Sequence, residues 1–198
     1  ELKALRSQIN PHFLFNTLNT IRYFIRKEPR QARRLLLDLS DVFQRALRSG
    51  DFVTLEQELE YVRAYLNLEQ ARLGARLSVE LDAIPPDLLL SLVPTLILQP
   101  IVENAVIHGI SKQKPGGTVR VSAEQQDGQL VLTVSDTGRG MTAETVATLL
   151  DPAFETSSIA LRNVAGRLEA IYEGEFDFQI ASELGKGTCV TMKVPLGR

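Results

Sequence analysis

Several features that define common protein classes are scarce or absent in this sequence of 198 residues. It has one cysteine, Cys189, so an internal disulfide and a cysteine-based zinc site are both excluded, and a disulfide-stabilised secreted scaffold with them. The 22 Lys and Arg against 24 Asp and Glu give a net charge of −2, without the basic excess typical of direct nucleic-acid binding. No apolar run reaches the roughly 18 residues of a membrane-spanning helix, and no signal-peptide pattern is present.

The composition otherwise matches that of an ordinary globular protein. Hydrophobic residues make up 44% and charged residues 23% of the sequence, which argues against a disordered or fibrous chain. The length allows one or two domains. Because the first residue, Glu1, already belongs to a helical pattern, we interpret the chain as a piece of a longer protein in which a membrane segment could lie upstream.

The first 73 residues read as helix almost throughout. Pro29 suits a first helical turn, and Gly74 follows the last apolar residue of a helical segment. Thr54 and Gln57 have the spacing of a capping box, in which each side chain bonds the other residue's backbone N–H group. These signals predict three helices, over residues 2–26, 29–49 and 54–73.

The first of these helices has an unusually wide apolar surface. A helix that is buried on one side needs an apolar stripe only about 100° wide, but here the apolar side chains occupy more than one face. They are Phe13, Leu14, Phe15, Leu18, Ile21, Phe24 and Ile25. A hairpin with the second helix covers one face, and we expect dimerisation into a four-helix bundle to cover the other.

From residue 74 onward the hydrophobic period changes. Apolar and polar residues alternate as in strands over residues 76–81, 118–123, 129–134, 176–181 and 188–194, and helical patterns cover residues 100–108, 142–150 and 160–172. Asp127-Gly128 predicts a tight hairpin between two of the strands. We therefore predict two domains, a helical region over residues 1–73 and, over residues 74–198, an α+β domain with helices against one face of a mostly antiparallel sheet.

His12 is the first candidate for chemistry. Pro11 removes a backbone donor and predicts a kink or restart of the helix there, with Asn10 as its cap. Imidazole changes its charge near neutral pH and can act as a nucleophile or a base. Asn16 lies one turn further on and could hold a ring nitrogen by a hydrogen bond. From spacing alone, a helix-surface histidine without a role is an equally good interpretation.

A second cluster lies in a predicted helix that contains Glu103, Asn104 and His108. An amide oxygen is a hard ligand that suits magnesium, and a neighbouring carboxylate could orient or deprotonate a nucleophile. An ordinary helix with a polar outer face that stops at Gly109 explains the same residues.

A third cluster runs from Asp136 to Met141, between a strand and a helix. Gly138 and Gly140 would let the backbone approach a ligand closely, and Asp136 could accept a hydrogen bond from an amine such as that of adenine. A fourth, residues 185–188, opens the last strand. A tight strand-to-helix turn and an ordinary hairpin turn are the simpler explanations of these two clusters.

The order of these clusters is far more specific than any one of them. The segment around PHFLFN, residues 11–16, resembles the phosphoacceptor region of LytS-type sensor histidine kinases. Glu103-Asn104 resembles the N box of the GHKL (Bergerat) ATPase fold. Residues 136–140 resemble its adenine-binding glycine box, residues 161–168 its lid-proximal helix and residues 185–188 its last glycine box. The resemblance covers essentially the whole chain.

The resemblance implies a cytoplasmic kinase core of a bacterial membrane sensor that autophosphorylates with ATP and Mg²⁺. His12 would accept the phosphoryl group, Glu103 would act as general base or orienting carboxylate, and Asn104 would bind the metal. The remaining nucleotide-binding residues would be His108, Asp136, Gly138, Gly140, Met141, Ala160, Leu161 and Thr188. The implied partners are a second copy of the chain and a response regulator, typically of the LytTR type, without direct contact to nucleic acid.

The sequence departs from the family pattern around the lid. Ser158 and Ala160 stand where the family has glycines, and Ile107 stands where its N box often has lysine. The lid between Met141 and Ser158 is short and poor in glycine. Two alternatives follow: a pseudokinase that binds a partner without transferring phosphate, or a GHKL ATPase that hydrolyses ATP with water. Since one glycine-to-alanine change is mild, we favour the active kinase.

Overall fold

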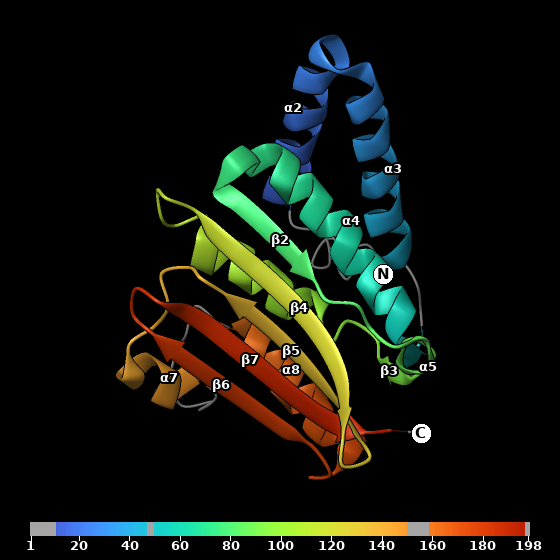
Figure 1. The fold of residues 1–198 in the computed structure, drawn as a ribbon, viewed down its shortest axis with the longest axis vertical. Helices are drawn as coiled ribbons and strands as arrows, with labels where there is room; N and C mark the ends of the chain where they lie inside the picture. Colours follow the sequence, from blue (N-terminus) through green and yellow to red (C-terminus); the bar gives the residue numbers. More distant parts are fainter. Residues whose placement is uncertain (1–10, 47–49, 150–158, 197–198) are drawn as a thin grey trace.

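The computed structural model describes residues 11–46, 50–149 and 159–196. A helical hairpin of α2 (Pro11–Lys27) and α3 (Pro29–Ala46) projects from the rest of the molecule, and α4 (Leu55–Leu73) lies between it and the sheet (Figure 1). The three predicted helices are therefore present. The predicted helical residues 2–10, the cap at Asn10 and residues 47–49 lie outside the described residues. No helix in the described part of the chain is both long and apolar enough to cross a bilayer.

The hairpin is apolar on its inner and its outer surface. Ile21, Leu35 and Leu39 are buried at 6% exposure or less, and they join the two helices to the core. Five large apolar side chains are instead between 48% and 66% exposed: Phe15, Leu18, Ile25, Leu36 and Leu37. The second apolar surface that the sequence predicts is therefore open to solvent in a single chain.

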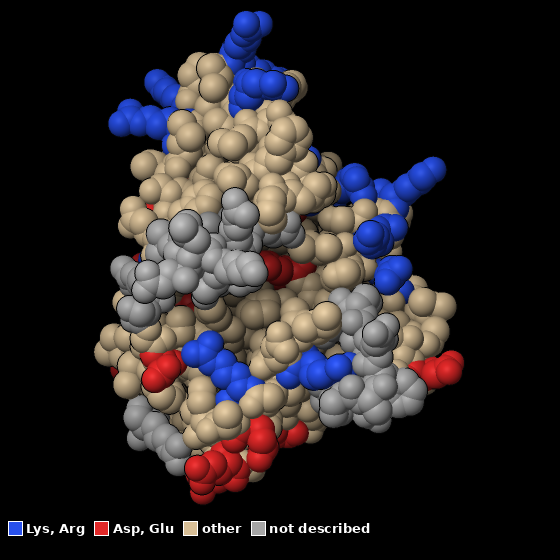
Figure 2. Space-filling model, turned by 180° about the vertical axis from the view of Figure 1, so that it is seen from behind, with Lys and Arg blue, Asp and Glu red and all other residues tan. Residues whose placement is uncertain are grey.

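Lys and Arg side chains gather at the end of the hairpin furthest from the sheet (Figure 2). They belong to the last turns of α2 and the first turns of α3 and are all exposed: Arg22, Arg26, Lys27, Arg30, Arg33 and Arg34. The net charge of −2 thus conceals a strongly basic hairpin tip.

The predicted capping box starts α4. The Gln57 N–H donates to Thr54 Oγ1 over 3.3 Å, and the Thr54 N–H donates to Gln57 Oε1 over 3.2 Å. The helix ends at Gly74, whose φ of +61° lies in the left-handed region. Unlike the hairpin helices, α4 is buried on most of its circumference, because it contacts α2 and α3 on one side and the sheet domain on the other.

A five-stranded sheet forms the second part of the chain. Its strands are β2 (Leu77–Leu81), β4 (Gly117–Gln126), β5 (Gln129–Asp136), β6 (Asp177–Glu183) and β7 (Gly187–Pro195). Their order is β2-β4-β5-β7-β6, and every neighbouring pair is antiparallel except β2 and β4. The predicted hairpin at Asp127-Gly128 is confirmed, with φ of +51° and +79°, as its type of turn requires.

Helices cover one face of this sheet. They are α6 (Gln99–Asn104), its continuation η2 (Ala105–Ile110) and α8 (Ile159–Tyr172), and α7 (Ala143–Leu149) lies near β6 (Figure 1). The sequence did not predict the strand pair β1 (Phe52–Thr54) and β3 (Leu92–Pro94), the short helix α5 (Pro86–Leu89) or the turn η1 (Gly74–Arg76). The predicted fold class, a helical region followed by an α+β sandwich, is confirmed.

One predicted helix end is wrong. The sequence suggested that the helix of Glu103 and Asn104 stops at Gly109, but it continues to Ile110 as a π-helical turn in which the Ser111 N–H bonds Val106 O over 2.8 Å. Gly109 is required there for a packing reason. A Cβ atom at this position would lie 2.6 Å from Asp136 Oδ1.

Candidate functional site

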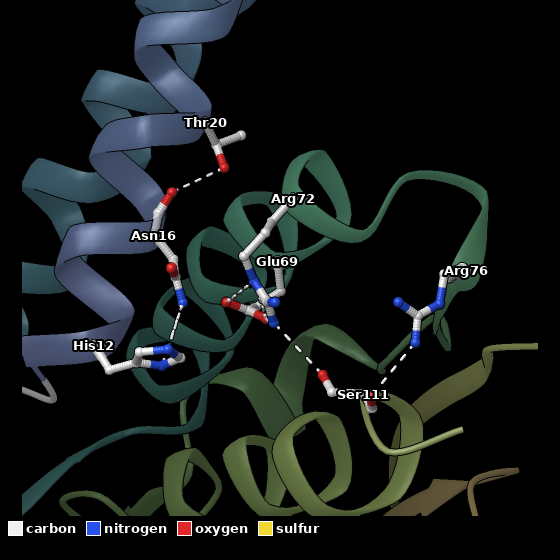
Figure 3. Close-up of polar contacts among 7 residues, drawn as sticks. All are labelled: His12, Asn16, Thr20, Glu69, Arg72, Arg76 and Ser111. Carbon is white, nitrogen blue, oxygen red and sulfur yellow. Dashed lines mark hydrogen bonds and ion pairs between the residues drawn. The ribbon is translucent and has the colours of Figure 1, made fainter. Parts of the chain in front are cut away.

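His12 lies in the first turn of the described part of α2, and its side chain is exposed. Asn16, one turn further on, places its Nδ2 3.2 Å from His12 Nδ1 and 3.3 Å from Nε2 (Figure 3). The Thr20 hydroxyl in turn donates to Asn16 O over 2.9 Å. The structure therefore contains the contact that helix spacing predicts, and orientation of the imidazole by Asn16 remains a prediction.

The imidazole faces a pocket of about 190 Å³, which we call the His12 pocket. Three segments that are far apart in the sequence form it. Its lining residues are His12, Phe13 and Asn16 from α2, Tyr65, Glu69 and Arg72 from α4, and Ile107, Ser111 and Lys112 from η2 and the residues after it. The helix of the phosphoacceptor candidate and the helix of the N-box candidate thus meet across α4.

Glu69 and Arg72 form an ion pair in this pocket. Arg72 Nε donates to both oxygens of Glu69, over 3.2 and 3.1 Å, and Nη2 bonds the same carboxylate (Figure 3). Nη2 also points toward Ser111 Oγ at 3.5 Å. Glu69 is only 3% exposed. This pair was not predicted from the sequence, in which the signal was limited to an acidic and a basic residue three positions apart in a helix that is buried on most sides.

Glu103 has different neighbours from those expected of a base for His12. Its Oε1 accepts hydrogen bonds from the Tyr61 hydroxyl over 3.0 Å and from Gln99 Nε2 over 2.9 Å. Burial raises the pKa of Glu103, while these two hydrogen bonds act in the opposite direction. Glu103 is not among the residues that line the His12 pocket, where the carboxylate is that of Glu69.

An aromatic stack connects the neighbourhoods of His12 and Glu103. The ring centroids of Phe13 and Tyr65 are 5.3 Å apart. The rings of Tyr65 and Tyr61 are nearly parallel, with their centroids 6.4 Å apart. Tyr61 and Tyr65 are at most 5% exposed. The ring contacts therefore hold α2 against α4, and the hydrogen bond from Tyr61 connects α4 to the helix that contains Glu103.

Asn104 is the last residue of α6 and is half-buried, directly before the π-helical turn. His108 lies within that turn and is also half-buried. Burial lowers the pKa of His108, and the nearby cations Lys112 and Arg139 lower it further, so the neutral imidazole is favoured.

Asp136 ends β5 and is 7% exposed. Its Oδ1 accepts the Gly138 N–H over 2.7 Å. Burial raises the pKa of this carboxyl to about 6, and the hydrogen bonds from the backbones of Gly138 and Thr188 limit that rise. Asp136 is thus a desolvated acceptor that the backbone holds in one orientation.

The glycines around Asp136 permit close contacts within the protein itself. A Cβ atom at Gly138 would lie 2.4 Å from the carbonyl carbon of Gly109. Gly140 has a φ of +63°, and a Cβ atom there would lie 2.0 Å from Glu183 O. Any larger residue at either position would displace the backbone around Asp136.

Thr188 lies beside Asp136, and Met141 is linked to Thr188 through Ser182. Thr188 pairs with Asp136 across β5 and β7, and its Oγ1 lies 2.9 Å from Ser182 Oγ. The same Ser182 oxygen accepts the Met141 N–H over 2.9 Å. The two glycine boxes of the sequence therefore meet here, and Ser182, which sequence analysis missed, connects them.

Ala160 and Leu161 lie in the first turn of α8. Leu161 is fully buried in the core and Ala160 is half-buried, so ligand contact by Leu161 would have to come from its backbone. Ser158 and most of the predicted lid lie outside the described residues. Within the parts that the structure describes, no three His, Cys, Asp or Glu side chains form a group that could hold a metal.

The chain matches two protein families. Residues 1–77 match the family described as histidine kinase, and residues 92–198 match that of histidine kinase-, DNA gyrase B- and HSP90-like ATPases. Over 98% of its length the chain is 39% identical to the sensor histidine kinase BtsS of Escherichia coli K12 and 38% identical to the sensor protein LytS of Bacillus cereus. It spans 33% and 34% of those proteins.

The fold comparison gives a similar result. The chain superimposes on the histidine kinase domain of the blue-light activated histidine kinase of Erythrobacter litoralis EL346 with a TM-score of 0.51. The match covers 98% of this chain and 93% of that domain at 20% identity, which supports the shared fold alone.

Proposed function

This chain belongs to the LytS-type sensor histidine kinases, and on that premise we propose that it is the ATP-dependent kinase core of a two-component system. It would transfer the γ-phosphoryl group of ATP to His12 and then to an aspartate of a response regulator. One observation carries the proposal: α2, α4 and the end of the Asn104 helix form one pocket around His12. The helix of the proposed acceptor and the end of the segment proposed to hold the nucleotide thus border the same pocket.

The surroundings of Asp136 suit an adenine base. A buried carboxylate with one oxygen fixed by Gly138 leaves acceptor capacity that an exocyclic amine can use, and desolvation strengthens such a hydrogen bond. Thr188 pairs with Asp136, and the Met141 backbone is connected to Thr188 through the Ser182 hydroxyl. We assign adenine binding to Asp136, with Gly138, Gly140, Met141 and Thr188 shaping the site, and phosphate contacts to His108 and the backbone of Ala160 and Leu161.

The available donor groups also suit magnesium in a nucleotide complex. The described residues contain no group of three or more His, Cys, Asp or Glu side chains that could hold a metal. In this proposal the protein contributes the Asn104 amide oxygen, a ligand that magnesium accepts, and phosphates and water would complete the coordination. A magnesium ion bound there supplies charge neutralisation on the phosphates.

His12 acts as the nucleophile in this proposal. The unprotonated ring nitrogen attacks the γ-phosphorus, an N–P bond forms, and the electron pair of the broken P–O bond leaves with ADP. The proton on the other ring nitrogen is then lost to a base. Asn16 would fix the ring orientation. We keep Glu103 as the candidate base or orienting carboxylate, although Tyr61 and Gln99 bind it in the present arrangement.

The remaining surfaces suggest partners. The exposed apolar face of α2 and α3 would pair with a second copy of the chain to complete a four-helix bundle. The phosphorylated His12, exposed on α2, would be accessible to a response regulator, which we propose is of the LytTR type. In the whole protein this core would lie on the cytoplasmic side of a membrane sensor.

The test is incubation of the chain with γ-labelled ATP and Mg²⁺. We expect acid-labile, base-stable label on the unaltered chain that is lost in His12→Ala and in Asn104→Ala. Asn19→Ala, on the same helix as His12, is the matched control and should retain the label. Label that persists in His12→Ala would refute the assignment. ATP hydrolysis without label would favour a hydrolase, and absence of both label and ATP binding would favour a pseudokinase.

A further inference from the structure

We propose that the His12 pocket receives the phosphoryl group once it is attached to His12, with Arg72 and Lys112 as its cationic contacts and Glu69 as the residue that positions Arg72. The inference rests on the proposed phosphorylation of His12. It adds a binding site for the product of that reaction, built by a helix outside both the phosphoacceptor motif and the nucleotide motifs.

The pocket has the composition that a phosphoryl group requires. Around the imidazole it presents the Asn16 amide, the Ser111 hydroxyl, the Arg72 guanidinium and the Lys112 ammonium group as hydrogen-bond donors. Arg72 and Lys112 outweigh the one carboxylate, so the walls around His12 carry a net positive charge. Its volume of about 190 Å³ is too small for a nucleotide-sized ligand but leaves room for a group attached to the ring.

Glu69 explains how Arg72 can serve this purpose. A guanidinium group has five N–H donors, and the Glu69 carboxylate binds it through Nε and Nη2. This arrangement fixes the plane of the group, while the Nη1 donors are not needed by Glu69. Because Glu69 is 3% exposed and cannot move into solvent, it holds Arg72 at the pocket before any phosphoryl group arrives. The entropic cost of ordering a long side chain is then already met.

The reaction itself supplies the charge that the pocket binds. When the N–P bond to His12 forms, ADP leaves with the electron pair of the P–O bond and the second ring nitrogen loses its proton. The product carries a phosphoryl group with up to two negative charges. Hydrogen bonds between an anionic oxygen and a guanidinium or ammonium group are the strong, charge-assisted kind. Arg72 and Lys112 therefore stabilise the product state more than the unmodified histidine.

The chain offers a matched control in Arg76. Its Nη2 donates to Ser111 O over 3.3 Å (Figure 3). The same atom donates to Gln113 O over 2.9 Å. It thus contacts the same loop as Arg72, from the turn that follows α4, without lining the His12 pocket. Arg76→Gln removes one positive charge near the pocket but none within it.

Chemical phosphorylation allows a test that is independent of the kinase reaction. The whole chain is treated with phosphoramidate, which phosphorylates histidine without ATP, and the phosphohistidine is followed by ³¹P NMR as a function of pH. His12→Ala identifies the resonance that belongs to position 12, since His108 is the only other histidine. Cations in contact with the phosphoryl group disfavour protonation of the phosphohistidine, so they lower its pKa.

We expect that pKa to rise by about half a unit or more in Arg72→Gln and in Lys112→Gln, and to stay unchanged in Arg76→Gln. Arg72→Gln leaves Glu69 buried without its partner, so the double variant Glu69→Gln/Arg72→Gln removes both charges and guards against misfolding. Identical titration curves for all of these chains would overturn the inference. If ATP gives no label, the proposed function fails, whereas the phosphoramidate titration still decides whether the pocket binds the phosphoryl group.

Discussion

The hairpin α2–α3 and the helix α4 differ in which side chains they expose and which they bury. The hairpin leaves large apolar residues such as Leu36 and Leu37 at least 50% exposed, whereas α4 buries two carboxylates, Glu58 and Glu69, at 5% exposure or less. An exposed apolar face is stabilised when a partner covers it, and a buried carboxylate is tolerated only when donors surround it. The difference indicates that α4 is satisfied within one chain and that the hairpin is not.

The partners of the α4 side chains show what this helix does. The Glu58 carboxylate accepts the N–H groups of Leu96, Ile97 and Leu98, over 2.8 to 3.1 Å, at the start of α6. Tyr61 holds Glu103 in the middle of the α6–η2 segment, and Arg72 lies at its far end. One helix therefore fixes the segment that contains Asn104 at its beginning, its middle and its end.

The largest expected effect comes from Glu58→Ala. It leaves three backbone N–H groups at the start of α6 without their acceptor, and we expect a loss of about 3 kcal/mol or more in the free energy of unfolding. Urea denaturation measures it. Glu56→Ala, an exposed carboxylate in the same turn of α4, should cost less than about 1 kcal/mol. Equal losses in the two variants would show that the start of α6 does not depend on α4.

Asp136 is a buried carboxylate outside α4, and its contribution to stability can be tested through its pH dependence. Its pKa is about 6 in the folded chain against a reference value of 3.8. The folded state therefore binds the proton more tightly, and the stabilisation from this group is complete below about pH 4 and lost as the pH rises through 6. We expect this contribution, on the order of 2–3 kcal/mol, to be absent in Asp136→Asn. The free energy of unfolding of both chains is measured at pH 4, 5, 6 and 7. A difference between the two chains that does not change with pH would contradict the prediction.

The role of the exposed apolar face of the hairpin can be tested by placing negative charges on it. Leu36→Glu with Leu37→Glu places two carboxylates on the surface that we expect to be a dimer interface. The dissociation constant of the dimer should rise at least tenfold, equivalent to about 1.4 kcal/mol, in analytical ultracentrifugation. Leu90→Glu is the control, because Leu90 is 70% exposed and belongs to the end of α5 and not to the hairpin. If the hairpin variant shows the same distribution of monomer and dimer as the unaltered chain, this face is not part of the dimer interface.

The smallest effect is expected for Tyr61→Phe. The change removes one hydrogen bond to Glu103 and keeps the ring of the aromatic stack, so we expect a loss of about 1–2 kcal/mol in the free energy of unfolding. Tyr23→Phe, at a position 58% exposed, should change it by no more than about 0.5 kcal/mol. If both variants unfold at the same denaturant concentration, Tyr61 does not fix Glu103.

Most of the fold could be predicted because its signals are local. The capping box at Thr54, the hairpin at Asp127-Gly128 and the alternating strands each follow from residues that are adjacent or a few positions apart. The pairing of β1 with β3 could not, because two three-residue strands have no periodicity to detect. The extension of the helix through Gly109 also escaped prediction, because glycine is typical of a helix end and the side chain that Gly109 accommodates, Asp136, lies on another element.

The same distinction between local and long-range contacts applies to the candidate site. The proximity of His12 and Asn16 follows from helix geometry, and the turn after Asp136 follows from its glycines. The contacts that α4 makes do not, because Tyr61 and Glu103 are 42 positions apart and no spacing rule relates them. The division into domains at residues 73 and 74, and the roles of the individual site residues, stay predictions.

The aromatic stack also gives the molecule an optical signal of its own. The chain has four tyrosines and no tryptophan, so its intrinsic fluorescence comes from tyrosine alone. Two of the four, Tyr61 and Tyr65, lie in the stack between Phe13 and Glu103, and a carboxylate acceptor quenches the emission of the tyrosine that bonds it. Any movement of α2 away from α4, or release of Glu103 from Tyr61, will change that emission. The unlabelled chain can therefore report in real time on the contacts that α4 makes with α2 and with Glu103.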